Sequence, residues 1–377
     1  MKYIDEFRDP QAARNIATAI AKEARPARHY RLMEFCGGHT HAIFRYGVQD
    51  LMPANVEFVH GPGCPVCVLP VGRIDEAMQL AQKQGVILCT YGDVMRVPAG
   101  QRRTLLQAKA DGADIRMVYS TEDALRIARD HPDKQVVFFA IGFETTTPPT
   151  AVAIQQARAQ GLENFSVFCN HVLTPAALEA ILNAAEPVDI DAFLGPSHVS
   201  TIIGSRPYEA FAEQYGKPIV IAGFEPLDVM QSALMAIRLL NQGRNVVENQ
   251  YTRAVTRQGN TKAQALVAEV FELRASFEWR GLGLITDSAL KIRPEYAEYD
   301  AERRFAVRAG PFFDVRGCDC PGVLRGLKKP LDCKLFGTVC TPENPMGACM
   351  VSSEGACAAY WSYGRFRGEQ KKKETLA

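Results

Sequence analysis

Short apolar runs alternate with helix-like stretches along much of this chain, and that alternation limits the folds open to it. The runs at residues 86–90 and 136–141 have the character of buried strands, and further candidates lie at 165–169, 190–194 and 218–222. Helix-like segments such as 175–184 and 207–215 separate them. Strands that alternate with helices build parallel sheets with helices on both faces. The sequence therefore predicts an α/β fold of doubly wound parallel sheets.

The length of the chain is sufficient for two or three domains. It has 377 residues, of which 47% are hydrophobic and 23% charged, enough for a sizeable buried core. We expect an α/β domain at residues 1–134, a second at 135–245, and a helical or irregular domain at 246–377. Residues 308–349 are rich in proline, glycine and cysteine with little periodicity. A small region of that kind generally needs a metal or a crosslink to fold.

The charge balance argues against nucleic acid or an acidic membrane as a partner. Lysine and arginine number 43 against 42 acidic residues, for a net charge of +1, so the chain has no general electrostatic attraction to polyanions. The first residues lack the apolar core of a signal peptide, and no apolar run is long enough to span a bilayer. We expect a cytoplasmic protein. In that reducing compartment its eleven cysteines should be reactive thiols or metal ligands.

Acidic residues follow three of the predicted strands. Asp93, Glu144 and Glu225 each stand three residues past an apolar run, and the last two share the motif Gly-Phe-Glu. The carboxyl ends of parallel strands line the ligand crevice of an open sheet, so these acids could face a common cleft. The alternative is that they stabilise helix N-termini, where carboxylates offset the free N–H groups.

The run CGGHTH at residues 36–41 has the composition of a reactive site. A thiolate and imidazoles bind iron, nickel or zinc and transfer protons, and the two glycines allow close approach to a ligand. Cys36 is therefore a candidate metal ligand, with either His39 or His41 beside the reaction centre and the other in a capping role. His198, which follows the strand predicted at 190–194, is a further candidate.

The CPVC motif at residues 64–67 lies among prolines and glycines that shape a turn. A Cys-x-x-Cys pair readily forms a small ring disulfide, and one of its thiols can have a lowered pKa. Half of a zinc site is the alternative, but the chain has no second Cys-x-x-Cys pair to supply the remaining ligands. We therefore favour a redox couple formed by Cys64 and Cys67.

Six cysteines lie within the last sixty residues. Four of them, Cys320, Cys333, Cys340 and Cys357, are separated by 12, 6 and 16 residues, a spread spacing compatible with a [4Fe–4S] cluster, although tetrahedral zinc is also chemically possible. Cys318 stands too near Cys320 to bind a separate corner comfortably. Cys349 has apolar neighbours, as a buried free thiol would. We expect these two to be spare.

Several of these motifs together resemble the HypD family of [NiFe]-hydrogenase maturation proteins. The matching segments are CGGHTH at 36–41, GPGCPVC at 61–67, GFETT at 142–146, EWRGLG at 278–283 and SSEGAC at 352–357. The resemblance extends from about residue 3 to about 363. Where some relatives carry another cysteine near Lys328, this chain has two lysines, which supports the four cluster ligands chosen above.

The resemblance implies two α/β domains of related topology and a cysteine-rich domain with a [4Fe–4S] cluster. It also implies help in building the Fe(CN)2CO group of the hydrogenase, in complex with the small chaperone HypC and with cyanide delivered by HypE.

Joined with the motifs, the resemblance leads to a mechanism. Cys36 would hold the transient iron that carries cyanide and CO, together with a cysteine of the HypC-type partner. Cys64 and Cys67 would supply electrons and be recharged by the cluster, while Asp93 and Glu354 would carry protons. This route requires the cluster to lie near Cys64 and Cys67.

Two other classes of protein remain open. A thioredoxin-like or Fe–S dithiol–disulfide oxidoreductase acting on a protein partner would need only Cys64 and Cys67, and Cys36 would be dispensable. A non-catalytic scaffold would hold structural zinc in its C-terminal region. A radical S-adenosylmethionine enzyme is disfavoured because no Cys-x3-Cys-x2-Cys run is present.

Overall fold

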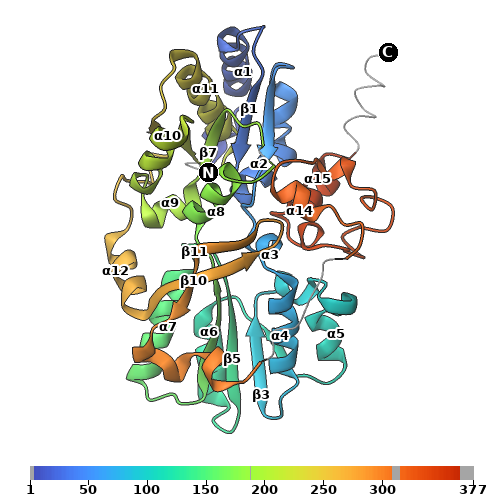
Figure 1. Cartoon of the computed structure of the whole chain (residues 1–377), viewed down its shortest axis with the longest axis vertical. Helices are drawn as coiled ribbons and strands as arrows, with labels where there is room; N and C mark the ends of the chain where they lie inside the picture. Colours follow the sequence, from blue (N-terminus) through green and yellow to red (C-terminus); the bar gives the residue numbers. More distant parts are fainter. Residues whose placement is uncertain (1–3, 187, 308–314, 366–377) are drawn as a thin grey trace.

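Two parallel sheets lie one above the other along the long axis of the molecule (Figure 1). The computed structural model describes residues 4–186, 188–307 and 315–365. A β-hairpin crosses the middle of the molecule, and the cysteine-rich C-terminal segment lies beside the junction of the two sheets. The predicted α/β class with parallel, helix-covered sheets is confirmed.

The upper sheet, which we call sheet A, has the strand order β2-β1-β7-β8-β9. Its strands are β1 (Tyr30–Glu34), β2 (Val56–His60), β7 (Ala192–Pro196), β8 (Ile219–Ala222) and β9 (Val247–Asn249). All neighbouring strands are parallel, and the first pair is in register from Tyr30 opposite Val56 to Glu34 opposite His60. The chain order within this sheet is thus 2-1-3-4-5, which is common in doubly wound folds.

The lower sheet, sheet B, repeats the same arrangement with one strand fewer. Its order is β4-β3-β5-β6, and its strands are β3 (Val86–Thr90), β4 (Ile115–Met117), β5 (Gln135–Gly142) and β6 (Phe165–His171). Counted in chain order, this is 2-1-3-4. The two sheets therefore have the related topology that the family resemblance implied.

Strand pairing does not follow the boundaries predicted at residues 134 and 245. Sheet A takes β1 and β2 from before residue 134, β7 and β8 from after it, and β9 from beyond residue 245, while sheet B also takes strands from both sides of residue 134. The alternation of strands and helices indicates parallel pairing but carries no information on strand order. A division of the chain into consecutive segments therefore does not match the sheets, because the chain leaves sheet A after β2 and returns to it at β7.

Helices cover both faces of each sheet. On sheet A, α1 (Pro10–Glu23), α2 (Gly37–Tyr46) and α11 (Pro226–Gln242) pack on one face, and α8 (Thr174–Leu182) and α10 (Glu209–Tyr215) on the other. On sheet B, α4 (Val71–Ala81) and α5 (Leu105–Ala110) lie opposite α6 (Thr121–Asp130) and α7 (Thr147–Ala159). Side chains such as Phe138 and Phe139 are completely buried, and the burial of each stabilises the folded state by about 1.5–3 kcal/mol.

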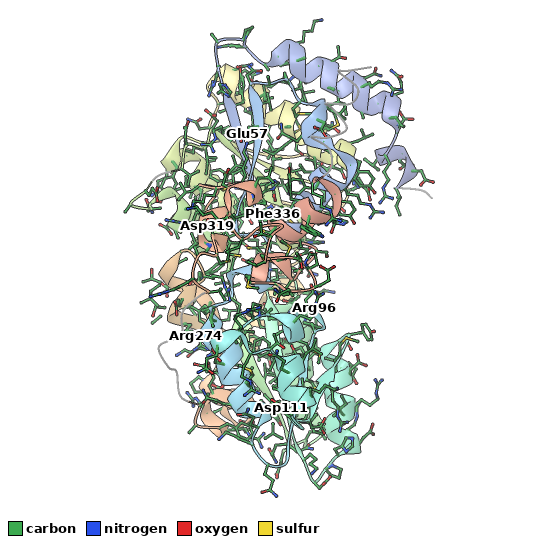
Figure 2. The ribbon with its side chains drawn as sticks, turned by 90° about the vertical axis from the view of Figure 1, so that its right-hand side faces the viewer. Glu57, Arg96, Asp111, Arg274, Asp319 and Phe336 are labelled. Carbon is green, nitrogen blue, oxygen red and sulfur yellow. A yellow bond between two sulfur atoms is a disulfide. The ribbon has the colours of Figure 1, made fainter. Side chains whose placement is uncertain are left out.

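The hairpin and the C-terminal segment connect the two sheets. The hairpin pairs β10 (Phe271–Trp279) with β11 (Gly283–Ile292), between α12 (Thr261–Val270) and α13 (Ala301–Arg304). The C-terminal segment contains α14 (Cys320–Leu324) and α15 (Ala356–Tyr363), the latter packed on α2. Lys329 Nζ lies 2.6 Å from Glu57 Oε1 on β2, and Arg96 donates to the carbonyl oxygen of Pro342. These two contacts tie the segment to both halves of the molecule, and Figure 2 shows Asp319 and Phe336 of the segment between Glu57 and Arg96.

No helix among the described residues is both long enough and apolar enough to cross a bilayer.

Candidate functional site

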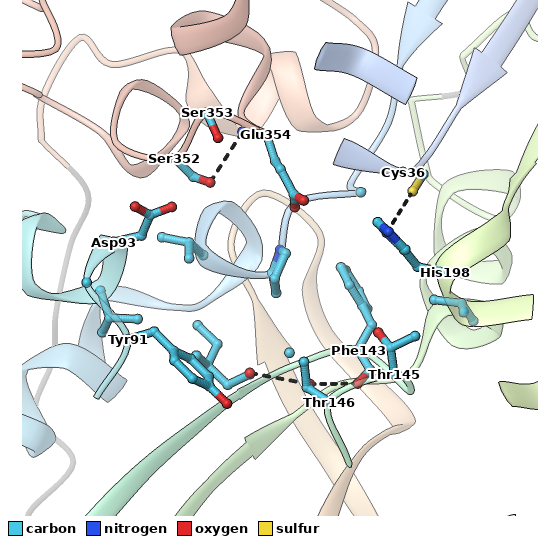
Figure 3. Close-up of a pocket in the computed structure, with 18 of the residues that line it drawn as sticks. Cys36, Tyr91, Asp93, Phe143, Thr145, Thr146, His198, Ser352, Ser353 and Glu354 are labelled. Carbon is cyan, nitrogen blue, oxygen red and sulfur yellow. Dashed lines mark hydrogen bonds between the residues drawn. The ribbon is translucent and has the colours of Figure 1, made fainter. Parts of the chain in front are cut away.

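A cavity of about 550 Å³ lies between the two sheets and the C-terminal segment (Figure 3). Cys36 follows β1 and His198 follows β7, the two strands of sheet A between which the strand order reverses. Asp93 and Thr146 follow β3 and β5, the corresponding pair of sheet B. Ligands of open parallel sheets bind at such reversal points, outside the carboxyl ends of the strands. The cavity is where both sheets would place a ligand.

Cys36 lies at the N-terminus of α2 with its thiol directed toward His198. Its residue is 4% exposed, and Sγ lies 3.7 Å from His198 Nδ1. Burial, followed by the negative charge of Glu354, raises the pKa of the Cys36 thiol to about 12. Glu354 packs directly against Gly37, where an added Cβ would lie 2.3 Å from the Glu354 Cβ. Position 37 therefore requires glycine. With a pKa of about 12, the Cys36 thiol is protonated at neutral pH.

Glu34 organises the turn that carries Cys36, and this role is not evident from the sequence motifs. Its side chain is completely buried. The carboxylate accepts hydrogen bonds from the Cys36 backbone N–H at 3.0 Å and from the Thr40 hydroxyl, and it pairs with His60 Nδ1 at 2.6 Å. The indication available in the sequence was an acid placed at the buried end of an apolar strand, which is rare unless that acid is paired.

The three candidate histidines have different surroundings. His198 lines the cavity, and burial, followed by the charge of His39, lowers its pKa to about 4. His39 is buried with Nε2 2.9 Å from the carbonyl oxygen of Ala222, and burial lowers its pKa. His41 Nε2 lies 3.2 Å from the Tyr363 hydroxyl, on the interface with α15. The structure therefore brings His198 to Cys36, and neither His39 nor His41 lines the cavity.

Of the acidic residues predicted near the strand ends, Asp93 lines the cavity together with Glu354. The pKa of Glu354 is raised by burial and then by the charges of Asp93 and Glu34. Glu144 instead accepts hydrogen bonds from the N–H and hydroxyl of Thr174 at the start of α8, both at 2.9 Å. Glu225 pairs with Arg8 and precedes α11. For these two, the helix N-terminal alternative is the correct one.

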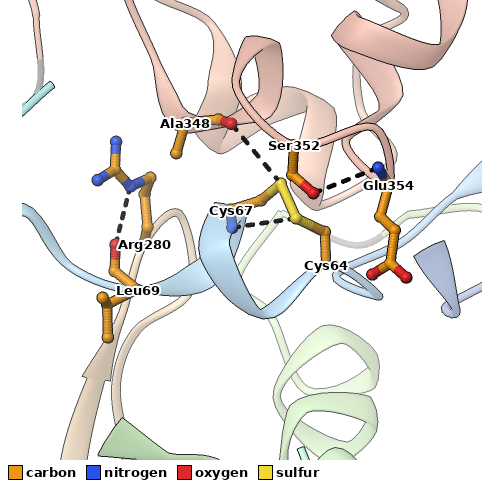
Figure 4. Close-up of a disulfide and its surroundings, with 7 residues drawn as sticks. All are labelled: Cys64, Cys67, Leu69, Arg280, Ala348, Ser352 and Glu354. Carbon is orange, nitrogen blue, oxygen red and sulfur yellow. Dashed lines mark hydrogen bonds between the residues drawn. A yellow bond between two sulfur atoms is a disulfide. The ribbon is translucent and has the colours of Figure 1, made fainter. Parts of the chain in front are cut away.

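Cys64 and Cys67 form a disulfide at the wall of the cavity (Figure 4). Their Cα atoms are 5.2 Å apart across the short helix α3 (Pro65–Val68), and the two residues are 3% and 0% exposed. Neighbouring Gly63, Pro65 and Val66 line the cavity. On its far side, Cys67 Sγ lies 3.9 Å from the carbonyl oxygen of Ala348, which precedes Cys349. The disulfide therefore lies between the cavity and the cysteine-rich segment.

The C-terminal cysteines are gathered around Cys320. The thiols of Cys318 and Cys349 are near enough to Cys320 to raise its pKa, and the Cys318 and Cys320 sulfur atoms both pack against Gly347, so the two cysteines expected to be spare lie beside Cys320. Cys340 Sγ accepts a hydrogen bond from the Met346 backbone N–H at 3.3 Å. In the part of the chain that the structure describes, no three His, Cys, Asp or Glu side chains already have the arrangement of a metal site. The set of buried soft donors nevertheless suits iron and sulfide.

Comparison with known proteins identifies the family. The HypD family model, described as "Hydrogenase formation hypA family", matches residues 11–364. The chain belongs to the HypD family. It is 64% identical over 371 residues to the hydrogenase maturation factor HypD of Azotobacter vinelandii, covering 97% of this chain and 98% of that protein. The HypD of Cupriavidus necator is 63% identical over 372 residues, with coverage of 97% and 98%. The HypD of Escherichia coli K12 is 47% identical over 368 residues, with coverage of 96% and 98%.

Four of the five motifs on which the HypD resemblance rested contribute to the cavity. They are the segments at residues 36–41, 61–67, 142–146 and 352–357, each of which supplies at least one lining residue. The fifth, at 278–283, lies at the turn of the β10–β11 hairpin behind the disulfide. Motifs separated by more than 300 residues in a HypD-family chain thus meet at one site.

Proposed function

We propose that this chain is a hydrogenase maturation factor that serves as the redox-active scaffold on which Fe(CN)2CO is assembled. The observation that carries the proposal is that Cys36 Sγ faces His198 in a cavity whose wall includes the Cys64–Cys67 loop. A metal-binding thiol and a two-electron thiol couple thus share one site. The names of the relatives, hydrogenase maturation factors, give the biological context.

The iron is cargo in this proposal, and Cys36 is its ligand on this chain. Thiolate is a soft ligand and suits iron that carries cyanide and carbon monoxide. Because the Cys36 pKa is about 12, iron binding must displace the thiol proton. His198 is neutral, since its pKa is about 4. Its Nδ1 lies 3.7 Å from Cys36 Sγ, so His198 is the proposed acceptor of the thiol proton. Glu354 and Asp93 line the same cavity and are the proposed proton carriers.

A HypC-type chaperone would supply a second cysteine to the iron, and a HypE-type protein would deliver cyanide. Two of the residues that line the cavity, Met117 and Tyr119, are also exposed to solvent, by 50% and 85%. Exposed aromatic residues around a cleft are typical of protein contact sites. This supports access by a partner protein to the cavity that Cys36 lines. The proposed compartment is the cytoplasm.

The cysteine-rich segment is proposed to hold a [4Fe–4S] cluster. The predicted ligands remain Cys320, Cys333, Cys340 and Cys357, and all four are buried. Such a cluster, when bound, supplies one-electron transfer. Cys320, one of the proposed ligands, lies beside Cys349, and the carbonyl oxygen of the preceding residue, Ala348, lies 3.9 Å from Cys67 Sγ, which supports an electron route between the cluster and the disulfide.

The alternative, a dithiol–disulfide oxidoreductase acting on another protein, is less well supported. Exchange with a partner requires direct attack on one of the two sulfur atoms. Both cysteines of the disulfide are buried, with 3% and 0% of the residue exposed. Reduction by a small molecule, or by electrons from the cysteine-rich segment, would suit this geometry better than attack by a thiol of another protein.

The proposal is tested with a Cys36→Ala variant. The variant and the parent chain are each produced with their HypC-type and HypE-type partners and isolated without oxygen, and infrared spectra are recorded in the region of metal-bound CN and CO. We expect the bands in the parent complex and their loss in the variant. Cys89→Ala is the matched control, because Cys89 is a buried thiol in the core of sheet B, away from the cavity. Bands of normal intensity from Cys36→Ala would reject the scaffold role and favour the oxidoreductase.

A further inference from the structure

The ring of Phe224 covers one face of the His198 imidazole. The two ring centroids lie 3.9 Å apart, and the ring planes are tilted by 35°. His198 stands in the first turn of α9 (Ser197–Ile203) and lines the cavity, where Figure 3 shows its side chain directed toward Cys36. Among the described residues, Cys36 and Phe224 supply the hydrogen-bond and ring contacts of this imidazole. A thiol is a weak hydrogen-bonding group, so the Phe224 ring is the main restraint on its orientation.

Phe224 is itself held in place on two sides. Its ring packs against Gly38 in the first turn of α2, where an added Cβ would lie 2.8 Å from Phe224 Cδ1. Tyr251 meets the Phe224 ring in a T-shaped contact with the centroids 5.8 Å apart. Arg253 lies over the Tyr251 ring at 4.3 Å and pairs with the buried carboxylate of Asp228. Contacts from separate parts of the chain thus fix the position of the Phe224 ring.

The second glycine of the CGGHTH motif makes room for this ring. Gly38 lies within α2 and does not have a positive φ, so an alanine there would not strain the backbone. The space that its Cβ would need is taken by Phe224 Cδ1 at 2.8 Å and Cε1 at 3.1 Å, with His198 Cε1 at 3.6 Å. Position 38 is therefore limited to glycine by the ring that covers His198.

We propose that Phe224 is a positioning residue for His198, holding the imidazole with Nδ1 toward Cys36 Sγ. This rests on the part of the proposed function in which His198 accepts the thiol proton as iron binds. In that step the S–H bond breaks, its electron pair stays on sulfur and bonds to iron, and the proton passes to Nδ1. Proton transfer needs the two atoms in a productive geometry. An imidazole that can rotate on the cavity wall spends less time in that geometry, and the Phe224 ring limits this rotation.

The first test measures the ring contact in solution. The full chain is labelled with ¹³C at histidine Cε1, and the His198 signal is assigned as the one missing from His198→Gln. A stacked aromatic ring shifts the Hε1 resonance upfield. We expect Phe224→Leu to move this resonance downfield, and Phe224→Tyr, which keeps the ring, to leave it near its position in the parent chain. An unmoved resonance in Phe224→Leu overturns the inference.

The second test measures assembly. Each variant is produced with its HypC-type and HypE-type partners for the same short period, and the infrared intensity of metal-bound CN and CO is measured per chain. We expect a fall of about tenfold in Phe224→Leu and at most about threefold in Phe224→Tyr, since one aromatic contact changes the population of an orientation by roughly this range. Gly38→Ala, which displaces the same ring, should also lower the intensity. Normal intensity in Phe224→Leu overturns the inference.

Phe211→Leu is the matched control. Phe211 is a partly buried ring in contact with Tyr215 on α10, with the centroids 6.1 Å apart. It should change neither the His198 resonance nor the bands. Equal losses of the bands in Phe211→Leu and Phe224→Leu would assign the effect to general stability and overturn the inference.

Two further outcomes are decisive. If Phe224→Leu does not fold, Gly38→Ala decides by the same two measurements, and an unmoved resonance with normal bands refutes the inference. Normal bands in His198→Gln would refute the proposed role of His198. The position of the His198 resonance separates that result from a failure of Phe224 to hold the imidazole.

Discussion

The substitution Glu34→Gln tests how the turn of Cys36 is held in place. The Glu34 carboxylate accepts from the Cys36 N–H through Oε2, and from Thr40 and His60 through Oε1. Glutamine has nearly the same shape, but one of its two terminal atoms is an NH2 donor. Its oxygen can serve Thr40 and His60 only if the NH2 group is turned toward the Cys36 N–H, which then has no acceptor. One donor is left unpaired in a completely buried site.

The size of the effect follows from these contacts. A hydrogen bond to a charged group contributes about 1.5–3 kcal/mol, and an unpaired buried donor costs about 1–3 kcal/mol. These two energies are not additive, because both describe the same Cys36 N–H group. Loss of the negative charge also weakens the contact with His60. We expect the free energy of unfolding to fall by about 3 kcal/mol.

Urea denaturation followed by far-ultraviolet circular dichroism measures this difference. Glu57→Gln is the matched control, because Glu57 lies on the adjacent strand β2 and its side chain is 28% exposed, with Lys329 at 2.6 Å and Arg31 at 3.4 Å. Partly exposed ion pairs of this kind contribute at most about 1 kcal/mol. If Glu34→Gln destabilises the chain no more than Glu57→Gln does, the carboxylate does not hold the turn and the reasoning is wrong.

Three further predictions concern charge and metal. Glu354→Gln removes a negative charge that raises the Cys36 pKa, so alkylation of Cys36 by iodoacetamide at pH 9 should become several-fold faster, and an unchanged rate in peptide mass spectra would contradict this. Burial raises the pKa of Glu144 from 4.5 to about 7, so the stability it contributes is complete below pH 4.5 and is lost as pH rises through 7. The free energy of unfolding of the parent should therefore fall by about 3 kcal/mol over that range relative to Glu144→Gln, whereas a constant difference would refute the shift. The chain isolated without oxygen should contain about four iron and four sulfide per chain, Cys320→Ser should lose both, and Cys349→Ser should retain them if the four predicted ligands are correct.

The positions of the strands could be predicted well because a buried parallel strand is a continuous apolar run. The strand expected at 86–90 is present over those residues, and the one expected at 218–222 begins one residue later. The strand expected at 190–194 is instead at Ala192–Pro196, because Asp191 turns its side chain to the Arg31 N–H. Strand order could not be predicted, since pairing of β1 with β7 depends on contacts some 160 residues apart.

The site could be predicted in its composition but only partly in its geometry. The sequence predicts only that one of His39 and His41 lies beside the reaction centre. Both lie in α2, and residues two apart in an α-helix are separated by about 200°, so the two imidazoles point in different directions. His198 reaches Cys36 from the helix α9 (Ser197–Ile203), which follows β7, a strand that is adjacent to β1 in space and remote from it in sequence. The C-terminal thiols give a second example. Their spacing in the sequence suggested that Cys318 and Cys349 are spare, whereas folding places both beside Cys320.

The return of the chain to sheet A has a consequence for biosynthesis. β1 and β2 are complete at His60, but β7 does not end until Pro196, and translation at about 5–20 residues per second needs on the order of 10 s to cover that interval. During that time sheet B can form on the ribosome while the first two strands of sheet A have no central neighbour. Cys36 is therefore made early and acquires His198 late, so the cavity is completed only after most of the chain has left the ribosome.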